Sequence, residues 1–265
     1  MVKDGRMHST PHSQYLAPVI AATHRAGEVI MRYYNEGYTA SQKQDKSPVT
    51  EADIAANGLI TKVLLEIAPH IPIIAEEDTS NHGAPAVTHP LFWLVDPLDG
   101  TRAFVAGEPE FTVNIGLIEN GVPVLGVIYS PADGTLYYGS ADGAFRQKNG
   151  GAIEPIQVRE KPADGVTVVR SKSHPSKKTE EFLQTLQIKE LVAGSSSIKF
   201  CQVAEGNADI YPRFGRTMEW DTAAGHAILN AAGGYVLTAD GAPFLYGKAG
   251  YENPHFIAMG KAGNS

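Results

Sequence analysis

Two carboxylates stand three residues apart where an apolar, strand-forming run ends. Phe92 begins this run, which passes into Asp96, Pro97 and then Asp99 within the segment FWLVDPLDGTRAF. Side chains that follow a strand are aimed from a rigid scaffold, so catalytic groups often occupy such positions. The proline helps to fix the turn, and the carbonyl of Leu98 lies between the two acids. The spacing therefore indicates an oxygen-rich site that both acids face.

Further acids occupy the ends of other expected elements. Carboxylates brought together repel one another, and they form a stable cluster only when cations neutralise them or some are protonated. Oxygen ligands without His or Cys clusters suit Mg²⁺, which prefers carboxylates, waters and phosphate oxygens. The chain therefore predicts a Mg²⁺ site that can handle phosphate. The acids at element ends are Asp45, Asp53, Glu76, Glu77, Asp96, Asp99 and Asp221.

Each acid also has an ordinary structural explanation. Asp53 could serve only in a capping box with Thr50, and Asp221 could simply favour the N-terminal dipole of its helix. Glu76 and Glu77 could begin a solvated loop, and the Asp-Pro and Asp-Gly pairs could form an ordinary turn. Taken singly, these residues leave both explanations open. The conjunction of the segments VTEAD, EED, DPLDGT and WDTAAG favours the metal site.

The elements that must position these acids follow from the spacing of apolar residues. Apolar residues at helical spacing predict helices, and alternating runs with Asn-Gly or Asp-Gly turns predict hairpins. The expected helices lie at residues 12–35, 50–68, 176–187 and 220–234, with another after the serine-rich turn at 194–197. The expected strands lie at residues 71–77, 91–95, 166–174 and 208–214, with hairpins at 111–129 and 134–150.

The order of these elements predicts the fold class. Antiparallel strands dominate the middle of the chain, whereas strands and helices alternate after about residue 160. We therefore predict an α/β (α+β) protein in two parts. Residues 12–155 form an N-terminal α+β part with an antiparallel sheet and most of the metal ligands. Residues 156–265 form a C-terminal α/β part that carries Asp221.

Composition limits the partners and the compartment. The 265-residue chain has a formal net charge of -7, which disfavours binding to long nucleic acid. We expect neither a transmembrane segment nor a signal peptide, because long apolar runs are missing. Cys201, the single cysteine, is expected to be a buried structural thiol, which suits the reducing cytoplasm. No anchor is visible for attachment to the cytoplasmic face of the inner membrane. A homodimer that forms through an apolar strand or helix face is compatible with the sequence, which does not decide the oligomeric state.

Two longer motifs resemble a known family. The segments WLVDPLDGT, residues 93–101, and WDTAAGHAILNAAGG, residues 220–234, resemble hallmarks of the inositol monophosphatase superfamily. The resemblance extends over about residues 15–259. The segments DKSPVTEAD, DPLDGTRAF and GSSSIKFCQVAEGNADIYPRFG look most like its bacterial 3'(2'),5'-bisphosphate nucleotidase branch. The resemblance implies a layered α-β-α-β-α sandwich of the inositol monophosphatase and fructose-1,6-bisphosphatase type. It also implies hydrolysis of adenosine 3',5'-bisphosphate to AMP and phosphate.

The same resemblance assigns catalytic roles by position. Asp45 and Thr101 match the pair that orients the attacking water, and Glu76 aids the activation of that water. Gly100 and Thr101 also match backbone N–H donors to the phosphate. The residues that match metal ligands are Glu76, Asp96, Leu98 through its carbonyl, Asp99 and Asp221, with Asp53 for a further metal ion or its waters.

The resemblance also implies contacts to a phosphorylated nucleotide. A nucleotide with two phosphates needs a second anion clamp, whereas a monophosphate sugar does not. One position departs from the family pattern, because Arg102 stands where lysine is common, and the two side chains bind phosphate differently. The residues that match nucleotide contacts are His174, Ser196, Lys199, Arg213 and Asp221.

Two or three Mg²⁺ ions per site, with inhibition by Li⁺ and Ca²⁺, complete what the resemblance implies. An inositol-1-monophosphatase or another sugar-phosphate phosphatase would share the metal site, so the metal ligands cannot distinguish it. A non-catalytic metal or nucleotide sensor is disfavoured because Asp45, Glu76 and Thr101 are all present. A purely structural protein is disfavoured because an unfilled acidic pocket costs stability.

Overall fold

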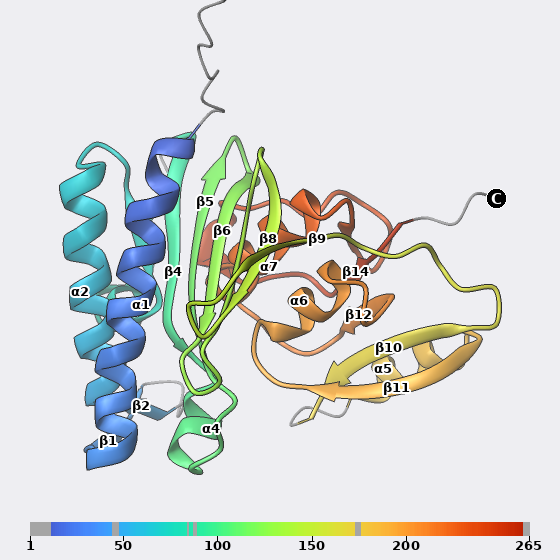
Figure 1. Cartoon of the computed structure of the whole chain (residues 1–265), viewed down its shortest axis with the longest axis horizontal. Coiled ribbons are helices and arrows are strands. Elements are labelled where there is room, and N and C mark those ends of the chain that lie inside the picture. The colour runs from blue at the N-terminus through green and yellow to red at the C-terminus, as the bar shows by residue number, and fades with distance from the viewer. Residues whose placement is uncertain (1–11, 44–47, 84, 87–88, 173–175, 262–265) are drawn as a thin grey trace, which may run out of the picture.

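Two large β-sheets, a small two-stranded sheet and three layers of helices make up the described part of the molecule (Figure 1). The computed structural model describes residues 12–43, 48–83, 85–86, 89–172 and 176–261. Across the molecule the layers are a helix pair, a seven-stranded sheet, a second helix pair, a five-stranded sheet and one short helix. This order confirms the predicted α-β-α-β-α fold class.

The seven-stranded sheet comes from the first part of the chain. Its strands lie in the order β3-β4-β5-β6-β7-β8-β9, and all neighbours are antiparallel except β3 and β4. The two predicted hairpins are β5–β6 and β7–β8. The strands are β3 (Ile73–Ala75), β4 (Leu91–Asp99), β5 (Thr112–Glu119), β6 (Val122–Ser130), β7 (Thr135–Ser140), β8 (Gly143–Lys148) and β9 (Ile153–Ile156).

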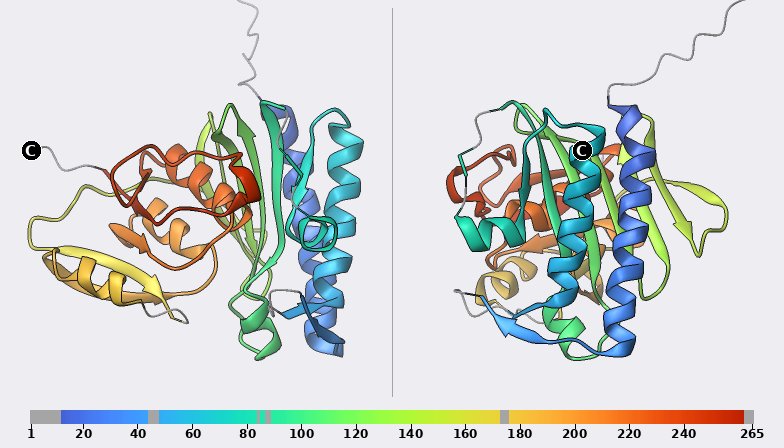
Figure 2. Two further views of the ribbon diagram at one scale, coloured as in Figure 1. Left: turned by 180° about the vertical axis from the view of Figure 1, so that it is seen from behind. Right: turned by 90° about the vertical axis from the view of Figure 1, so that its left-hand side faces the viewer.

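Two long helices, α1 (Ser13–Glu36) and α2 (Glu51–Ile67), cover the outer face of this sheet (Figure 2). They confirm the first two predicted helices. Successive strand residues point to opposite faces. Trp93 therefore packs beneath the helix pair, whereas Phe92 joins the core on the other face. This burial on both faces explains why β4 is an uninterrupted apolar run.

The second sheet and its helices come from the rest of the chain. Its strands lie in the order β11-β10-β12-β14-β13. Helices α6 and α7 lie between the sheets, where Val169 packs, and α5 covers the far face, where Val168 packs. The elements are β10 (Val166–Ser171), α5 (Lys177–Leu183), β11 (Ile188–Gly194), α6 (Ile198–Ala204), β12 (Ile210–Arg213), α7 (Glu219–Ala231), β13 (Tyr235–Thr238), the 3-10 turn η1 (Ala249–Tyr251) and β14 (Phe256–Met259).

Helix α7 lies unusually close to the first sheet. A Cβ atom on Gly126 of β6 would lie 2.2 Å from the Ala224 carbonyl oxygen, so only glycine permits this approach. Gly116 of β5 meets the same helix, since its Cβ would lie 2.8 Å from that of Ala223. The close contact holds the start of α7, with Asp221, beside the end of β4.

Some elements differ from the sequence prediction. The strand expected at residues 71–77 ends at Ala75, and the acids that follow begin helix α3 (Glu76–His82). Strand β11 was not predicted, because its residues are mostly exposed and show no apolar alternation. The remaining short elements are β1 (Ala40–Gln42), β2 (Pro48–Thr50) and α4 (Thr101–Val105).

A common apolar core joins α6 and α7 to both sheets. Cys201 lies fully buried in this core, which confirms the predicted structural thiol. The division into residues 12–155 and 156–265 stays a prediction. None of the helices in the described segments has both the length and the apolar character needed to cross a bilayer.

His226 of α7 is a titratable group inside this core and is 5% exposed. Its Nδ1 lies 3.1 Å from the hydroxyl of Tyr246, which donates in turn to Thr222 Oγ1. Burial lowers the pKa of His226 to about 3. The imidazole of His226 is therefore neutral in the folded protein at pH values at which it is protonated in the unfolded chain.

We expect the protein to lose stability through His226 as the pH falls below the ordinary histidine pKa of 6.5. The unfolded chain then binds a proton that the folded chain does not. Relative to a His226→Asn variant, whose amide can also donate to Tyr246, the extra loss should be about 2 kcal/mol between pH 7 and pH 5. Urea unfolding of both proteins at the two pH values measures it. Equal pH dependence would show that the ring is not held neutral.

Candidate active site

A bulge near the end of β4 places Asp96 and Asp99 on the same face of the sheet. Residues three apart on a regular strand point to opposite faces. Here Asp96 pairs with Asn114 and Asp99 with Thr112, so two residues of β4 oppose one residue of β5. A bulge re-aims side chains and tolerates Pro97, which has no N–H to donate. The strand therefore continues past its predicted end, and the two acids belong to it.

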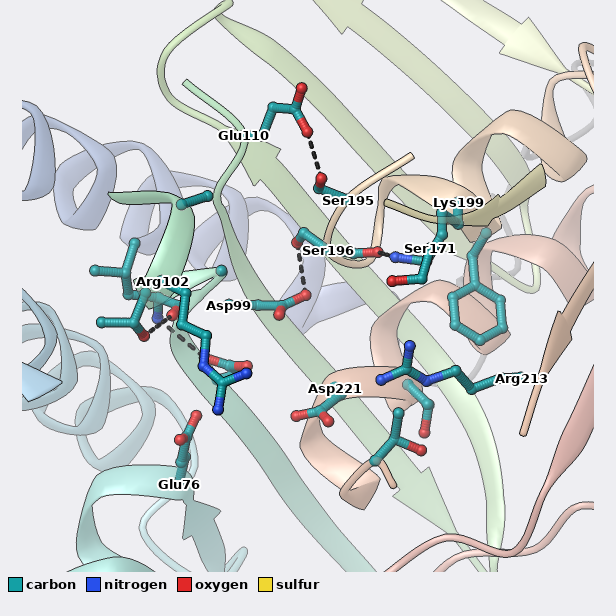
Figure 3. A pocket seen from close by; sticks show the side chains of 18 of the residues that line it. Glu76, Asp99, Arg102, Glu110, Ser171, Ser195, Ser196, Lys199, Arg213 and Asp221 are labelled. Carbon is teal, nitrogen blue, oxygen red and sulfur yellow. Dashed lines mark hydrogen bonds between the residues drawn. The ribbon is translucent and has the colours of Figure 1, made fainter. Parts of the chain in front are cut away.

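Glu76 and Asp221 reach the same cavity from the starts of two helices (Figure 3). Glu76 is the first residue of α3, and Asp221 lies in the first turn of α7, where its Oδ2 accepts the Met218 N–H at 2.8 Å. The cavity measures about 440 Å³. Four of the predicted metal-binding carboxylates therefore line one cavity, although they are widely separated in sequence.

Burial and repulsion from neighbouring acids raise the pKa values of two acids in this cavity, Asp96 and Asp221. Burial holds the pKa of Asp96 well above its ordinary value, and the charges of Glu76, Asp99 and Asp221 add to the effect. Burial, followed by the charge of Asp99, raises the pKa of Asp221 to about 8. Such a cluster retains protons near neutral pH unless cations neutralise it. The cavity is therefore an electrostatically favourable place for a cation.

The donor set fits Mg²⁺, because carboxylates and the Leu98 carbonyl supply only oxygen. In this conformation all four carboxylates accept hydrogen bonds from the protein, and two of them accept from side chains. Glu76 Oε1 accepts from Lys43 Nζ at 2.6 Å, and Asp99 Oδ2 accepts from Ser196 Oγ at 2.6 Å. Within the described segments, no three His, Cys, Asp or Glu side chains stand close enough to hold one ion. Cation binding would bring these carboxylates closer together than they stand in this structure.

Lys43 pairs with Glu76, an acid of the cavity, although no local sequence pattern indicates this contact. Its side chain is 7% exposed, and Nζ lies 2.6 Å from Glu76 and 2.7 Å from Glu77. Burial alone would lower the pKa of Lys43, but the two carboxylates raise it above its ordinary value. Burial raises the pKa of Glu77 to about 7. The nearer partner is 33 residues away, so no local pattern reports the pair.

Asp53 is at once a helix-capping residue and a neighbour of the cavity. Its Oδ2 accepts the Thr50 N–H at 2.7 Å, as the capping box predicted. The Thr101 hydroxyl lies 3.2 Å from Asp53 Oδ1 and 3.0 Å from the Leu98 carbonyl oxygen. Burial raises the pKa of Asp53. Asp45, the predicted partner of Thr101, lies outside the described residues.

Gly100 fixes the turn between β4 and α4. Its φ of 97° is a left-handed conformation that favours glycine. A Cβ atom there would lie 2.8 Å from the carbonyl oxygen of Glu110, so a larger residue would displace the turn. The turn brings Gly100 and Thr101 to the cavity surface, where their predicted contact with phosphate stays a prediction.

Ser196, Lys199 and Arg213 lie on the opposite wall (Figure 3). Lys199 is 4% exposed; its Nζ donates to the Ser196 carbonyl and lies 5.2 Å from the centre of the Tyr211 ring. Burial lowers the pKa of Lys199 to about 8. Arg213 donates through Nη2 to the Arg216 carbonyl at 3.1 Å, while its buried Nε has no partner in the described structure. This wall therefore offers N–H donors to an anion.

Glu110 connects the two sides of the cavity. Its carboxylate accepts from Lys172 Nζ and from Ser195 Oγ, and the lysine lowers the pKa of Glu110. Sequence reasoning missed this role, because the two partners lie 62 and 85 residues away. Arg102 also lines the cavity and directs its guanidinium inward (Figure 3). His174 lies outside the described residues.

Comparison with known proteins agrees with this geometry. The model of the inositol monophosphatase family matches residues 12–261. A protein from Salmonella typhimurium named 3'(2'),5'-bisphosphate nucleotidase CysQ is 44% identical, with 91% of this chain and 98% of the relative covered. A protein of the same name from Buchnera aphidicola is 46% identical, with 83% of each chain covered.

A solved structure gives the same result. The crystal structure of CysQ from Bacteroides thetaiotaomicron, described as a bacterial member of the inositol monophosphatase family, superposes with a TM-score of 0.79. It is 36% identical in sequence, and the match covers 95% of this chain and 99% of the other. The chain therefore belongs to the inositol monophosphatase family, and its similarity extends to the bacterial bisphosphate nucleotidase branch of that family.

Proposed function

We propose that this enzyme is a Mg²⁺-dependent 3'(2'),5'-bisphosphate nucleotidase, a phosphoric monoester hydrolase. Its substrate is adenosine 3',5'-bisphosphate, and its products are AMP and phosphate. One observation carries the proposal: a single cavity has four carboxylates on one wall, among them the buried Asp96, and the basic residues Lys199 and Arg213 on the other. The names of the similar bacterial proteins support this class of substrate, a 3'(2'),5'-bisphosphate nucleotide.

We call the side of the cavity formed by Glu76, Asp96, Asp99 and Asp221 the acidic wall. Its oxygen ligands are of the kind that Mg²⁺ prefers, so they suit the two or three predicted ions. When bound, they neutralise charge on the phosphate and the leaving oxygen and lower the pKa of the attacking water. Asp53 is the candidate for holding the weakest ion or its waters. The residues that would hold the other ions are Glu76, Asp96, Asp99 and Asp221, with the carbonyl of Leu98.

The chain's own groups orient the reactants. The Thr101 hydroxyl can accept a hydrogen bond from the attacking water while it donates its own proton to a neighbouring oxygen. Asp45 is the predicted second member of the pair that orients this water. The N–H groups of Gly100 and Thr101 would bind phosphate oxygens at the turn. Water attacks phosphorus as the bond from phosphorus to the ribose 3'-oxygen breaks. One proton of the water ends on that oxygen, which leaves as the 3'-hydroxyl, and the other stays on the released phosphate. Correct placement of the water and the ester lowers the activation barrier, because the translational and rotational entropy of bringing them together is already lost when the substrate binds.

The basic wall explains the choice of a nucleotide with two phosphates. Lys199 and Arg213 offer charged donors to the 5'-phosphate, and charge-assisted bonds are about twice as strong as neutral ones. Ser196 also matches a contact to the nucleotide, particularly its second phosphate, and Asp221 is a further predicted substrate contact. His174 is the predicted neighbour of the base or ribose. An inositol-1-phosphate molecule would leave this wall without an anion to bind.

A phosphate-release panel tests the proposal. With Mg²⁺ present, we expect kcat/KM for adenosine 3',5'-bisphosphate to exceed that for inositol 1-phosphate by at least about tenfold, which corresponds to about 1.4 kcal/mol. Both activities should disappear without Mg²⁺, and Li⁺ and Ca²⁺ should inhibit. Faster turnover of inositol 1-phosphate would instead favour a sugar-phosphate phosphatase on the same scaffold.

This activity would place the enzyme in sulfur metabolism, because sulfate activation and transfer release adenosine 3',5'-bisphosphate. A cytoplasmic location is proposed from the same role and from the single buried cysteine. Association with the inner face of the membrane and a homodimer stay predictions.

A further inference from the structure

A closed ring of hydrogen bonds beside the cavity joins strands β4 and β5 to the turn between β11 and α6. Ser196 Oγ donates to Asp99 Oδ2 at 2.6 Å and lies 2.5 Å from Thr112 Oγ1. Thr112 Oγ1 lies 2.9 Å from Ser197 Oγ, which donates to Asn114 Oδ1 at 2.7 Å. Asn114 Nδ2 closes the ring by donating to Asp99 Oδ2 at 3.4 Å. These five residues form what we call the hydroxyl ring.

The hydroxyl ring has a buried side and a cavity side. Thr112 and Asn114 are 0% exposed, and Ser197 is 2% exposed. None of these three is among the described residues that line the cavity, whereas Asp99 and Ser196 both line it. The buried three do not line the cavity themselves, and their contacts within the ring reach it through Asp99 and Ser196.

Strand pairing and one turn assemble the ring. Thr112 lies opposite Asp99 in the β4–β5 ladder, and Asn114, two residues further along β5, points to the same face. Ser196 and Ser197 come from the turn between β11 and α6 in the other half of the chain. The ring therefore ties an acidic-wall residue to the turn that begins the basic wall.

Ser196 has a backbone conformation that needs external support. Its φ of 53° lies in the left-handed region, which costs a non-glycine residue about 1 kcal/mol or more. Its hydroxyl is held by Asp99 and Thr112, and its carbonyl accepts from Lys199 Nζ. Strain at a residue of a candidate site persists only when its surroundings hold it in place.

Thr112 is the member on which the ring depends. Each hydroxyl has one proton to donate, and the two serines direct theirs to Asp99 and Asn114. The Thr112 hydroxyl contacts both serine hydroxyls, so its own proton serves one of these contacts. Removal of that hydroxyl would open the ring without changing a residue of the cavity surface.

We infer that Thr112, supported by Asn114 and Ser197, is a positioning residue that fixes Ser196 and Asp99 relative to each other. It thereby sets the distance between the acidic wall, where metal ions are proposed to bind, and the basic wall, where the nucleotide is proposed to bind. The inference rests on the proposed function for the identity of the substrate, but the contacts themselves do not depend on it. The ordinary alternative is that these bonds only stabilise the fold.

A matched pair of substitutions separates these roles. Thr112→Val keeps the branched shape and removes the hydroxyl, whereas Thr112→Ser keeps the hydroxyl. We expect kcat/KM for adenosine 3',5'-bisphosphate to fall about 10- to 100-fold in the valine variant, since small misplacements near the reacting groups cost that much. The serine variant should stay within about threefold of the unmodified enzyme. Similar losses in both variants, or none in the valine variant, would overturn the inference.

A double-mutant cycle and hydrogen exchange complete the test. If Thr112 acts through Ser196, Thr112→Val should cost little more in a Ser196→Ala background, whereas independent effects would add. Backbone amides of residues 195–199 should exchange faster in the valine variant but not in the serine variant. If the enzyme prefers another phosphate ester, the double-mutant cycle is measured with that ester as the substrate. The hydrogen-exchange measurement does not require a substrate. Additive losses together with unchanged exchange would overturn the inference whatever the substrate.

Discussion

Replacement of Asp96 by Asn should lower phosphate release from adenosine 3',5'-bisphosphate by at least about 1,000-fold, because the loss of several kcal/mol of charge stabilisation by the ions corresponds to that factor. The fold should survive, because Asp and Asn have nearly the same shape. Asp96 is 2% exposed, and its Oδ1 accepts the Leu98 N–H at 3.0 Å. An amide oxygen can still accept that bond but carries no charge for a cation.

The stability of the Asp96→Asn variant should change in the opposite direction to its activity. Burial and neighbouring acids raise the pKa of Asp96 in the folded protein, so the ionised group opposes folding as the pH rises toward neutrality. Without metal, the variant should therefore unfold at the same temperature as the unmodified protein or higher. Mg²⁺ should raise the melting temperature of the unmodified protein and have a much smaller effect on the variant.

Phosphate-release kinetics and thermal melts with and without Mg²⁺ check both parts. Asp164→Asn is the matched control, since Asp164 pairs with Lys189 on the exposed surface and should be neutral in both assays. Retention of most activity by Asp96→Asn, with an unchanged response to Mg²⁺, would remove Asp96 from the metal site. Loss of the fold in the variant would contradict the prediction of an intact structure.

The second prediction concerns the basic wall. Arg213→Ala should lower kcat/KM for adenosine 3',5'-bisphosphate by about 100-fold, the effect of losing about 2 to 3 kcal/mol of charged hydrogen bonds. The kcat/KM of the Arg213→Lys variant should lie between those of Arg213→Ala and the unmodified enzyme, because lysine keeps the positive charge but lacks the planar guanidinium group. The buried Nε without a partner and the contact from Nη2 to the Arg216 carbonyl leave the guanidinium with donors to offer.

Adenosine 3'-monophosphate is the control substrate for this prediction. It has the same scissile phosphate but no 5'-phosphate, so its kcat/KM should change by no more than about threefold in Arg213→Ala. Steady-state kinetics on both nucleotides give the comparison. Equal losses on the two substrates would show that Arg213 supports the scissile phosphate or the fold rather than the second anion.

Local pattern was sufficient for much of the fold. The helical spacing of α1 and α2, the turn residues of the two hairpins and the apolar run of β4 all depend on neighbours in sequence, and each appears in the structure. The acids of the motifs DPLDGT and WDTAAG were also found by sequence, and the structure brings Asp96, Asp99 and Asp221 to one cavity. Their metal-binding roles stay predictions.

Tertiary structure alone decided how these residues are aimed. The bulge that turns Asp96 and Asp99 to one face depends on the register of β4 against β5. A single strand carries no information about that register, because only cross-strand partners define it.

The partners of the site residues were also beyond local pattern. Lys43 meets Glu76 across 33 residues, and Ser196 meets Asp99 across 97. Sequence therefore determined which chemical groups this protein has and which elements carry them. The packing of two sheets around α6 and α7 determined which of those groups meet, because such contacts join segments that no local spacing relates.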